Sequence, residues 1–173
     1  MAGMIGRPPA TEAAIFYFTY IDQVGGEDAL AVMEQQLEES YAFLAGISEE
    51  PSLRRYSPGK WSIRQVLNHV TDTERAFAFR ALWFARGYDT PLPGFDQEIA
   101  ASGAAADRIS WGAHLEEFRR VRSSTISLFR NMPAEGWMRG GIASDNFVTV
   151  RALAFIIAGH SAHHFAILRE RYV

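Results

Sequence analysis

Apolar residues recur at steps of three and four positions along four long segments of this 173-residue chain. That spacing puts them on one face of a helix, and each such face must be covered by a neighbouring element. Residues 136–150 have turn residues, and we expect one or two short extended pieces there, but nothing in the chain predicts a substantial sheet. We therefore predict an all-α fold, a four-helix bundle. Its expected helices span residues 28–46, 62–86, 111–131 and 149–173.

Residues that start and end helices stand at the limits of these segments. Asp28 and Ser110 have side chains that cap helix N-termini. Ser62 followed by Gln65 has the pattern of a capping box, in which each side chain bonds to the other residue's backbone N–H. Gly87 follows the second segment directly and is of the residue type that most often ends helices.

Two further segments lie outside the predicted helices. The first half of residues 86–108 is rich in Pro, Gly and Asp, so we expect a long loop between the second and third helices, with residues 89–98 walling a pocket. Residues 1–27 form an N-terminal arm whose Phe and Tyr side chains are too apolar to lie free in water. We expect this arm to be ordered and to cover the bundle or a dimer contact. The length favours a single domain, residues 1–173.

The composition excludes several classes of function. The net charge is −3, so a basic surface for nucleic acid is not expected. Cysteine is absent, which excludes disulfides, thiolate metal ligands and a cysteine nucleophile, and which fits a cytoplasmic location. No apolar run is long enough to span a bilayer, so we expect no membrane contact.

The last predicted helix combines an apolar first half with a group of histidines, in the sequence VRALAFIIAGHSAHHFAILRERY. At about 100° per residue, His160 and His164 fall in the middle of its apolar arc, and His163 falls at the edge. Two imidazoles in a dry interior are unfavourable unless something satisfies their nitrogens. Their spacing of four residues places them one turn apart on one face, within reach of a single metal ion.

A third candidate ligand lies in the second predicted helix. His69 is on a shoulder of the apolar arc there, so it can face a site between the helices. Three neutral ligands plus water would leave an open coordination position, as catalytic metal sites do. The alternative is that these are hydrogen-bonded core or surface histidines. His114 has polar neighbours, and we expect it to be solvated.

Other polar residues are candidates for supporting roles. Thr73 and Arg80 follow His69 along the same side of the helix and could bind a substrate, as could Asp96 in the long loop. Glu74 stands close to His69 in sequence and could support it as a hydrogen-bond partner. Ordinary surface charges and salt bridges are the alternative interpretation of the charged residues among them.

Three stretches resemble a known family when they are taken together. They read RRYSPGKWSIRQVLNHVTDTERAFAFRALWFARG, TPLPGFDQE and VTVRALAFIIAGHSAHHFAILRERY. This combination resembles the DinB-like superfamily of four-helix-bundle metal proteins, over nearly the whole chain from about residue 20. The resemblance implies that His69, His160 and His164 hold zinc or nickel, with water completing the shell. It also implies that His163 is not a ligand and that the protein forms a homodimer.

The same resemblance suggests an activity. Relatives with known reactions depend on small thiols, as bacillithiol transferases and mycothiol-dependent maleylpyruvate isomerases do, but this chain resembles the uncharacterised branch. Our leading hypothesis is a metal-dependent enzyme that activates water or a low-molecular-weight thiol against a small-molecule substrate, as a hydrolase or an S-transferase. The alternative is a non-catalytic bundle, stapled by the metal, that acts as a dimeric binding or stress-response protein.

Overall fold

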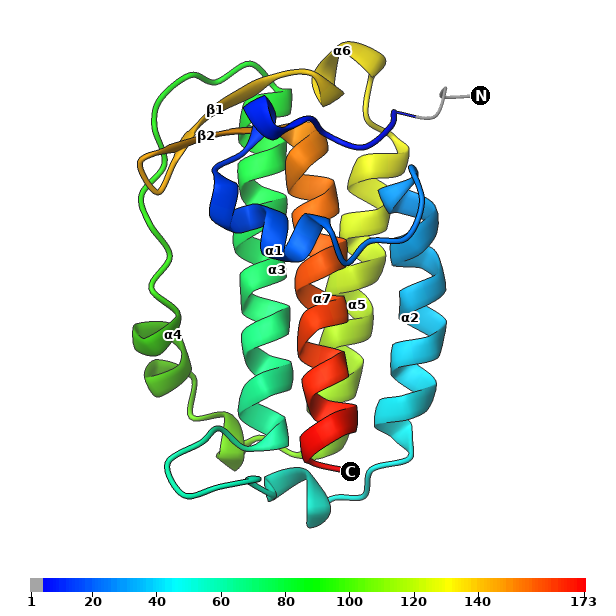
Figure 1. Ribbon diagram of the computed structural model, residues 1–173. Helices are drawn as coiled ribbons and strands as arrows, with labels where there is room; N and C mark the ends of the chain where they lie inside the picture. The colour runs from blue at the N-terminus through cyan, green and yellow to red at the C-terminus, as the bar shows by residue number, and fades with distance from the viewer. Residues whose placement is uncertain (1–4) are drawn as a thin grey trace.

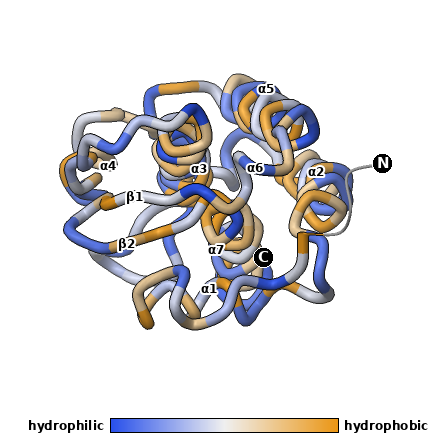
Figure 2. Tube along the Cα trace, turned by 90° about the horizontal axis from the view of Figure 1, so that it is seen from above, coloured by the Kyte–Doolittle hydropathy of each residue, from blue (hydrophilic) through white to orange (hydrophobic). Residues whose placement is uncertain are grey.

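Four long helices run side by side through the computed structural model, which describes residues 5–173 (Figure 1). They are α2 (Ala29–Ala45), α3 (Ile63–Ala85), α5 (Trp111–Arg130) and α7 (Val150–Arg171). The packed pairs are α3 with α7, α3 with α5, α2 with α5, and α2 with α7. The helices therefore form a closed ring, which the view from above also shows (Figure 2). The predicted four-helix bundle is confirmed.

The predicted helix ends are present as well. The Asp28 side chain accepts hydrogen bonds from two backbone N–H groups of α2, and the Ser110 side chain accepts one from α5. Ser62 and Gln65 form both bonds of the capping box at the start of α3. Gly87, just after α3, has a φ of 89°, a conformation that residues with a Cβ atom rarely adopt. These contacts satisfy backbone groups that helix termini otherwise leave unpaired.

The core consists of two apolar clusters that follow one another along the bundle. One contains Val150 and residues 152–158 of α7 with the last turns of α3 and the N-terminal arm. The other contains the first turns of α3 and the end of α7 from residue 165 onward. The intervening part of α7, residues 159–164, includes three histidines. Despite the apolar character of α7, none of the helices within residues 5–173 is long and apolar enough to cross a membrane.

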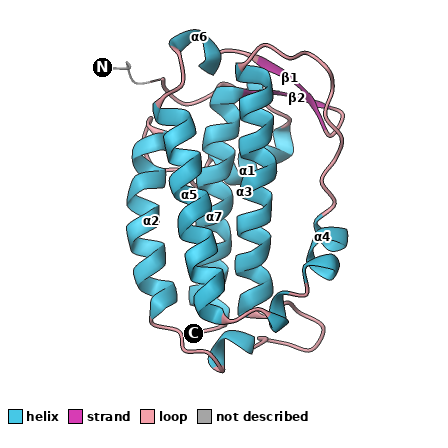
Figure 3. Ribbon diagram, turned by 180° about the vertical axis from the view of Figure 1, so that it is seen from behind, coloured by secondary structure: helices cyan, strands magenta, loops and turns pink. Residues whose placement is uncertain are grey.

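The connections between the long helices contain short helical pieces. The 3-10 helix η3 (Pro51–Leu53) precedes α3. The expected loop of residues 86–108 is partly helical, since it contains α4 (Gln97–Ala104) and the 3-10 helix η4 (Ala106–Arg108). α4 lies outside the ring of long helices and packs against α3 (Figure 3). This connection therefore adds a wall beside α3.

A small antiparallel sheet corrects the all-α prediction. After the short helix α6 (Ala134–Trp137), β1 (Gly140–Ala143) pairs along its whole length with β2 (Asn146–Thr149). The turn residues Ser144 and Asp145 have φ values of 52° and 61°, the left-handed conformation that a two-residue hairpin turn requires. The turn and the short extended pieces expected in residues 136–150 are present, but their pairing into a sheet was not predicted, because the strands are short and the turn lacks the glycine that usually marks such a turn.

The N-terminal arm packs across the outside of α7. It contains the 3-10 helices η1 (Ala10–Glu12) and η2 (Ile15–Tyr17) and the short helix α1 (Phe18–Ile21), which crosses in front of α7 in Figure 1. The approach is close at Gly159, where a Cβ atom would overlap the Tyr20 carbonyl group. The described part of the predicted arm, residues 5–27, is thus ordered against the bundle, and residues 1–4 lie outside the described residues.

Replacing Gly159 by alanine should weaken the docking of the arm, because the added methyl group must displace the backbone of Tyr20. We expect a loss of about 1–3 kcal/mol, seen as a Tm several degrees lower, together with faster proteolysis of the arm. Gly112→Ala is the matched control, since a Cβ atom there meets nothing within 4 Å, and its Tm should be unchanged or slightly higher. Equal behaviour of the two variants would contradict this packing.

Candidate metal centre

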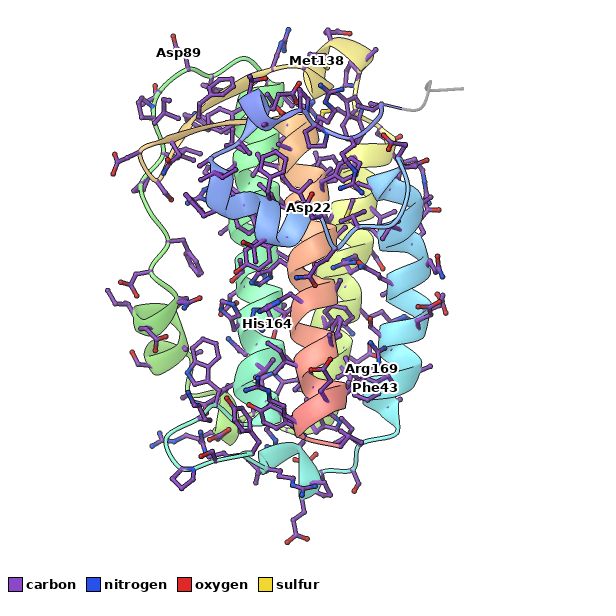
Figure 4. All side chains as sticks on the ribbon, viewed as in Figure 1. Asp22, Phe43, Asp89, Met138, His164 and Arg169 are labelled. Atoms are coloured by element: carbon purple, nitrogen blue, oxygen red, sulfur yellow. The ribbon has the colours of Figure 1, made fainter. Side chains whose placement is uncertain are left out.

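Three histidine side chains converge where α3 and α7 run side by side. His69 comes from α3, and His160 and His164 come from successive turns of α7; His164 is labelled between the two helices in Figure 4. One ring nitrogen from each lies within 4.8 Å of the others. The Nε2 atoms of His69 and His160 are 3.1 Å apart. Within residues 5–173 no other group of His, Asp and Glu side chains converges in this way. We call these three residues the histidine cluster.

Burial keeps the rings of the histidine cluster neutral at neutral pH. His69 and His160 are 5% and 4% exposed. Loss of hydration on burial lowers the pKa of His69 to about 4. Burial, with a smaller effect from the other histidines, lowers the pKa of His164 to about 3 and that of His160 well below its ordinary value. Neutral imidazole has a free lone pair and is the form that binds metal ions.

This set of donors fits a divalent metal ion. Two nitrogens that share a tetrahedral ion at zinc–nitrogen distances lie ~3.3 Å apart, close to the 3.1 Å between the Nε2 atoms of His69 and His160. Imidazole nitrogens suit zinc, nickel, copper and iron. Three protein ligands also leave at least one coordination position open. The residues present therefore fit the metal that the sequence suggested.

Neighbouring side chains hold two of these rings in place. The Thr73 hydroxyl oxygen lies 3.3 Å from Nδ1 of His69, so an N–H at Nδ1 can donate to it while Nε2 faces the histidine cluster. The Trp61 ring centre lies 5.0 Å from that of His69, and the Tyr20 ring centre lies 5.2 Å from that of His160. Each contact comes from a different part of the chain, so the arm and the segment before α3 both help to orient the site.

The other two histidines lie outside the cluster. His163 faces the N-terminal arm, where its Nδ1 atom is 3.4 Å from the Gln23 amide nitrogen. The prediction that His114 is solvated was wrong. His114 is 1% exposed, and its Nε2 atom lies 2.9 Å from the Ala106 carbonyl oxygen, because η4 folds back over the start of α5.

A buried polar layer lies next to the histidine cluster and joins all four long helices. Arg122 of α5 is 0% exposed. Its guanidinium donates to Glu74 of α3 at 2.9 Å, to Gln36 of α2 at 2.9 Å and to Ser161 of α7 at 2.5 Å. We call these four residues the polar layer. The supporting role that we expected for Glu74 is corrected: its carboxylate bonds to Arg122 and not to a histidine ring.

A cleft of about 230 Å³ leads to His69 and His160. We call it the Arg80 cleft, and its other walls include Tyr20, Thr73, Phe77, Arg80, Phe95 and Ser144. The arm, α3, the hairpin turn and the loop before α4 all contribute. The expectation that residues 89–98 wall a pocket is therefore met by Phe95 and Gln97.

Arg80 is the charged group of this cleft. It is 5% exposed, and its Nη2 atom donates to the Pro93 carbonyl at 3.1 Å and to the Ser144 hydroxyl at 2.8 Å. Among the described residues no carboxylate lies within 4.0 Å of it. The Arg80 cleft thus contains a cation without an acidic partner.

Of the other two residues that we expected to bind a substrate, one lines this cleft and one does not. Thr73 is in the wall and also contacts His69. Asp96 is not in the wall, which corrects that expectation; its carboxylate caps α4 by accepting hydrogen bonds from the backbone N–H groups of Glu98 and Ile99. An aspartate directly before the first residue of a helix is the sequence signal for a cap.

A second cleft, of about 320 Å³, reaches His164. We call it the aromatic cleft, and its other walls include Tyr56, Lys60, Trp61, Ile167 and Tyr172. Sequence reasoning did not find Tyr20 or Trp61, because their contacts with the histidines cross between elements and follow no periodic spacing. Gly159 just before His160 was the available signal for the arm, since a glycine within a helix often marks a close backbone approach.

The sequence and the fold are both similar to those of known proteins. The sequence profile of the DinB superfamily matches residues 33–168. No protein with a curated description matches the sequence. YfiT from Bacillus subtilis, described as a probable metal-dependent hydrolase with an unusual four-helix bundle topology, aligns over 82% of each chain with a TM-score of 0.71 and 18% identity.

A second solved structure aligns over a smaller share of its own chain. The mycothiol-dependent maleylpyruvate isomerase aligns over 79% of this chain and 58% of its own length, with a TM-score of 0.64 and 12% identity. At these identities the two likenesses show the fold and not the reaction.

Each of the replacements His69→Ala, His160→Ala and His164→Ala should reduce the amount of bound metal, because each removes one of three converging donors. We expect the metal affinity to fall by more than about tenfold, because even the loss of a residue that only supports a metal ligand lowers the affinity by about that factor. Elemental analysis after dialysis against zinc or nickel measures the effect. His163→Ala is the control and should retain its metal. Metal loss in His163→Ala with retention in His164→Ala would overturn the assignment.

The metal-free protein should become less stable as the pH falls from about 6.5 toward about 4. His69 has a pKa of about 4 when folded and 6.5 as its ordinary value, so between them the unfolded chain binds more protons and falling pH favours unfolding. Urea midpoints at about pH 7 and about pH 5 measure this decline. A variant with asparagine at His69 and His160 should decline less. An equal decline would show that other groups cause it.

Proposed function

Because the chain belongs to the DinB superfamily, we propose that it is a metal-dependent enzyme acting on a small anionic molecule in the Arg80 cleft. One observation carries this proposal. The buried, neutral histidine cluster opens into a cleft whose nearly buried arginine has no carboxylate partner among the described residues. A buried cation of this kind is a natural partner for a carboxylate or phosphate on a ligand.

We propose zinc or nickel as the ion, since both accept a set of imidazole ligands. Such an ion supplies Lewis acidity, which lowers the pKa of a water molecule or thiol that reaches it. His69, His160 and His164 would hold it, and Thr73 would fix the tautomer of His69 through the contact at Nδ1. A site with three protein ligands leaves room for a reactant.

The walls of the Arg80 cleft have distinct roles in this proposal. The planar guanidinium of Arg80 orients the anionic end of the substrate. Burial raises the pKa of the Tyr20 hydroxyl, so that this group stays protonated and can donate a hydrogen bond beside His160. Phe77 and Phe95 exclude water from the apolar part of the substrate. These residues come from three different elements, so the cleft exists only in the folded chain.

Two nucleophiles are consistent with this site. YfiT is described as a probable metal-dependent hydrolase, and the other structural relative is a mycothiol-dependent isomerase. We propose that water or a low-molecular-weight thiol attacks the substrate here. The chain contains no cysteine, so a thiol must come from a separate molecule. A non-catalytic metal staple is less well supported, because a staple closes its coordination shell and this cluster is reached by two clefts.

Turnover by the metal-loaded protein tests the proposal. The assay is NMR detection of products from small carboxylic acids that carry an ester, amide or halide group, with and without added cysteine as the thiol. Turnover should disappear on chelation, return with zinc or nickel, and be absent in His164→Ala. Turnover that survives chelation would show that the histidine cluster does not carry the reaction.

Replacing Arg80 by methionine should weaken binding of a small carboxylate by about 10-fold to 100-fold, because hydrogen bonds to a charged group contribute about 1.5–3 kcal/mol. Calorimetry with the metal-loaded protein measures the change. Ser144→Ala removes one hydrogen bond of Arg80 but keeps its charge, so it should have a much smaller effect. Equal losses in both variants would indicate that Arg80 acts by holding the hairpin turn and not by binding the ligand.

A further inference from the structure

The histidine cluster is reached by two clefts at successive levels of the bundle. α7 contributes His160 to the Arg80 cleft and His164, one turn later, to the aromatic cleft. α3 contributes residues from His69 onward to the first cleft and the earlier residue Val66 to the second. Gln97, at the start of α4, lines both clefts. Two molecules could therefore contact the same small cluster from different sides.

The two clefts differ in size and in surface. The Arg80 cleft has a volume of about 230 Å³ and the aromatic cleft about 320 Å³. Three aromatic rings wall the larger cleft, from Tyr56, Trp61 and Tyr172. The ring centres of Tyr56 and Tyr172 are 5.0 Å apart at 83°, and the Tyr172 hydroxyl donates to the Trp61 carbonyl at 2.8 Å. The walls are thus braced against one another and suit a flat, apolar body.

Cations predominate around the aromatic cleft. Lys60 lines it, and no carboxylate of the described residues lies within 4.0 Å of its amino group. The Arg171 guanidinium lies 5.4 Å from the Tyr56 ring centre, and Arg54 donates to the Tyr172 carbonyl at 3.2 Å. Glu98 is the one carboxylate in the wall. This balance favours a ligand with a negative end.

We propose that the aromatic cleft binds a second small molecule, a flat organic anion, at the same time as the Arg80 cleft holds its own ligand. Trp61 links the cleft to the cluster, because its ring packs against His69. The role of these two ligands rests on the proposed function. Both molecules would meet at the histidine cluster, as a reaction between two bound molecules requires.

Ligand-observed NMR on the zinc-loaded, full-length protein tests this with a matched pair of probes. The first is 3-phenylpropanoate, and the second is its neutral counterpart 3-phenylpropanamide. The anion should bind at least about fivefold more tightly than the amide, from its contact with Lys60. Lys60→Met, at an exposed position, should remove most of that difference without affecting the fold. Equal binding of the two probes to the unaltered protein would overturn the proposal.

Two filling variants show which cleft holds each probe. Ile167→Trp should weaken the binding of 3-phenylpropanoate by at least about tenfold, a change of about 1.4 kcal/mol in binding free energy. It should leave the binding of propanoate unchanged. Ala76→Trp, in the wall of the Arg80 cleft, should do the reverse. Saturating propanoate should not displace 3-phenylpropanoate. Displacement, or loss of both probes in Ala76→Trp alone, would show a single shared site.

Failure of this inference can be told apart from failure of the proposed enzyme. The walls of the aromatic cleft are side chains of the folded chain and do not include the ion. If the protein takes up no metal but still binds 3-phenylpropanoate in the Lys60-dependent way, the second site stands and the metal enzyme does not. If metal is bound and the anion is not preferred, the metal centre stands and the second site does not.

Discussion

The buried ion pair between Arg122 and Glu74 is the contact on which the positions of the three histidines depend. An arginine that is 0% exposed is highly unfavourable unless its N–H groups are paired. Here its partners come from three other helices, as Gln36, Glu74 and Ser161. Sliding α3 or α5 by one turn would separate the two buried charges, and sliding α2 or α7 would remove the hydrogen bond from Arg122 to Gln36 or to Ser161. Because Ser161 is adjacent to His160 in α7, the same contacts set the height at which His160 meets His69.

The polar layer and the histidine cluster lie between two apolar clusters, which explains how the bundle tolerates so many polar groups in its interior. The apolar part of α7 ends at residue 158 and resumes at residue 165. Burial keeps the imidazoles of the histidine cluster uncharged, so the interior does not have to hold three positive charges. Neutral rings lose little on burial when their nitrogens have partners, and they are also the form that can bind a metal ion. The stability of the bundle and the binding of a metal ion therefore both require these rings to be neutral.

The parts outside the bundle supply what the long helices lack. The arm, the hairpin turn and the loop before α4 carry the side chains that turn the surface beside the histidines into a cleft. Arg80 connects the loop to the hairpin turn, since it bonds to both Pro93 and Ser144. Farther along α7, some side chains pack against other helices. One example is Arg169, whose guanidinium carbon lies 4.6 Å from the centre of the Phe43 ring of α2 (Figure 4). The donors sit on rigid helices and the specificity elements on connections, an arrangement common in enzymes.

The helices, their caps and the inward faces of His160 and His164 could be read from the chain because they depend on neighbours within four residues. Helical periodicity and capping are local, so Asp28, Ser62 and Ser110 behave as their residue types predict. Pairings between distant elements could not be read in this way. The hydrogen bond from Arg122 to Glu74, the contact of His114 with the Ala106 carbonyl and the packing of Tyr20 on His160 each join residues from different elements. They form only when the long helices bring those elements together. The spacing of residues along the chain therefore does not predict which of these residues come into contact.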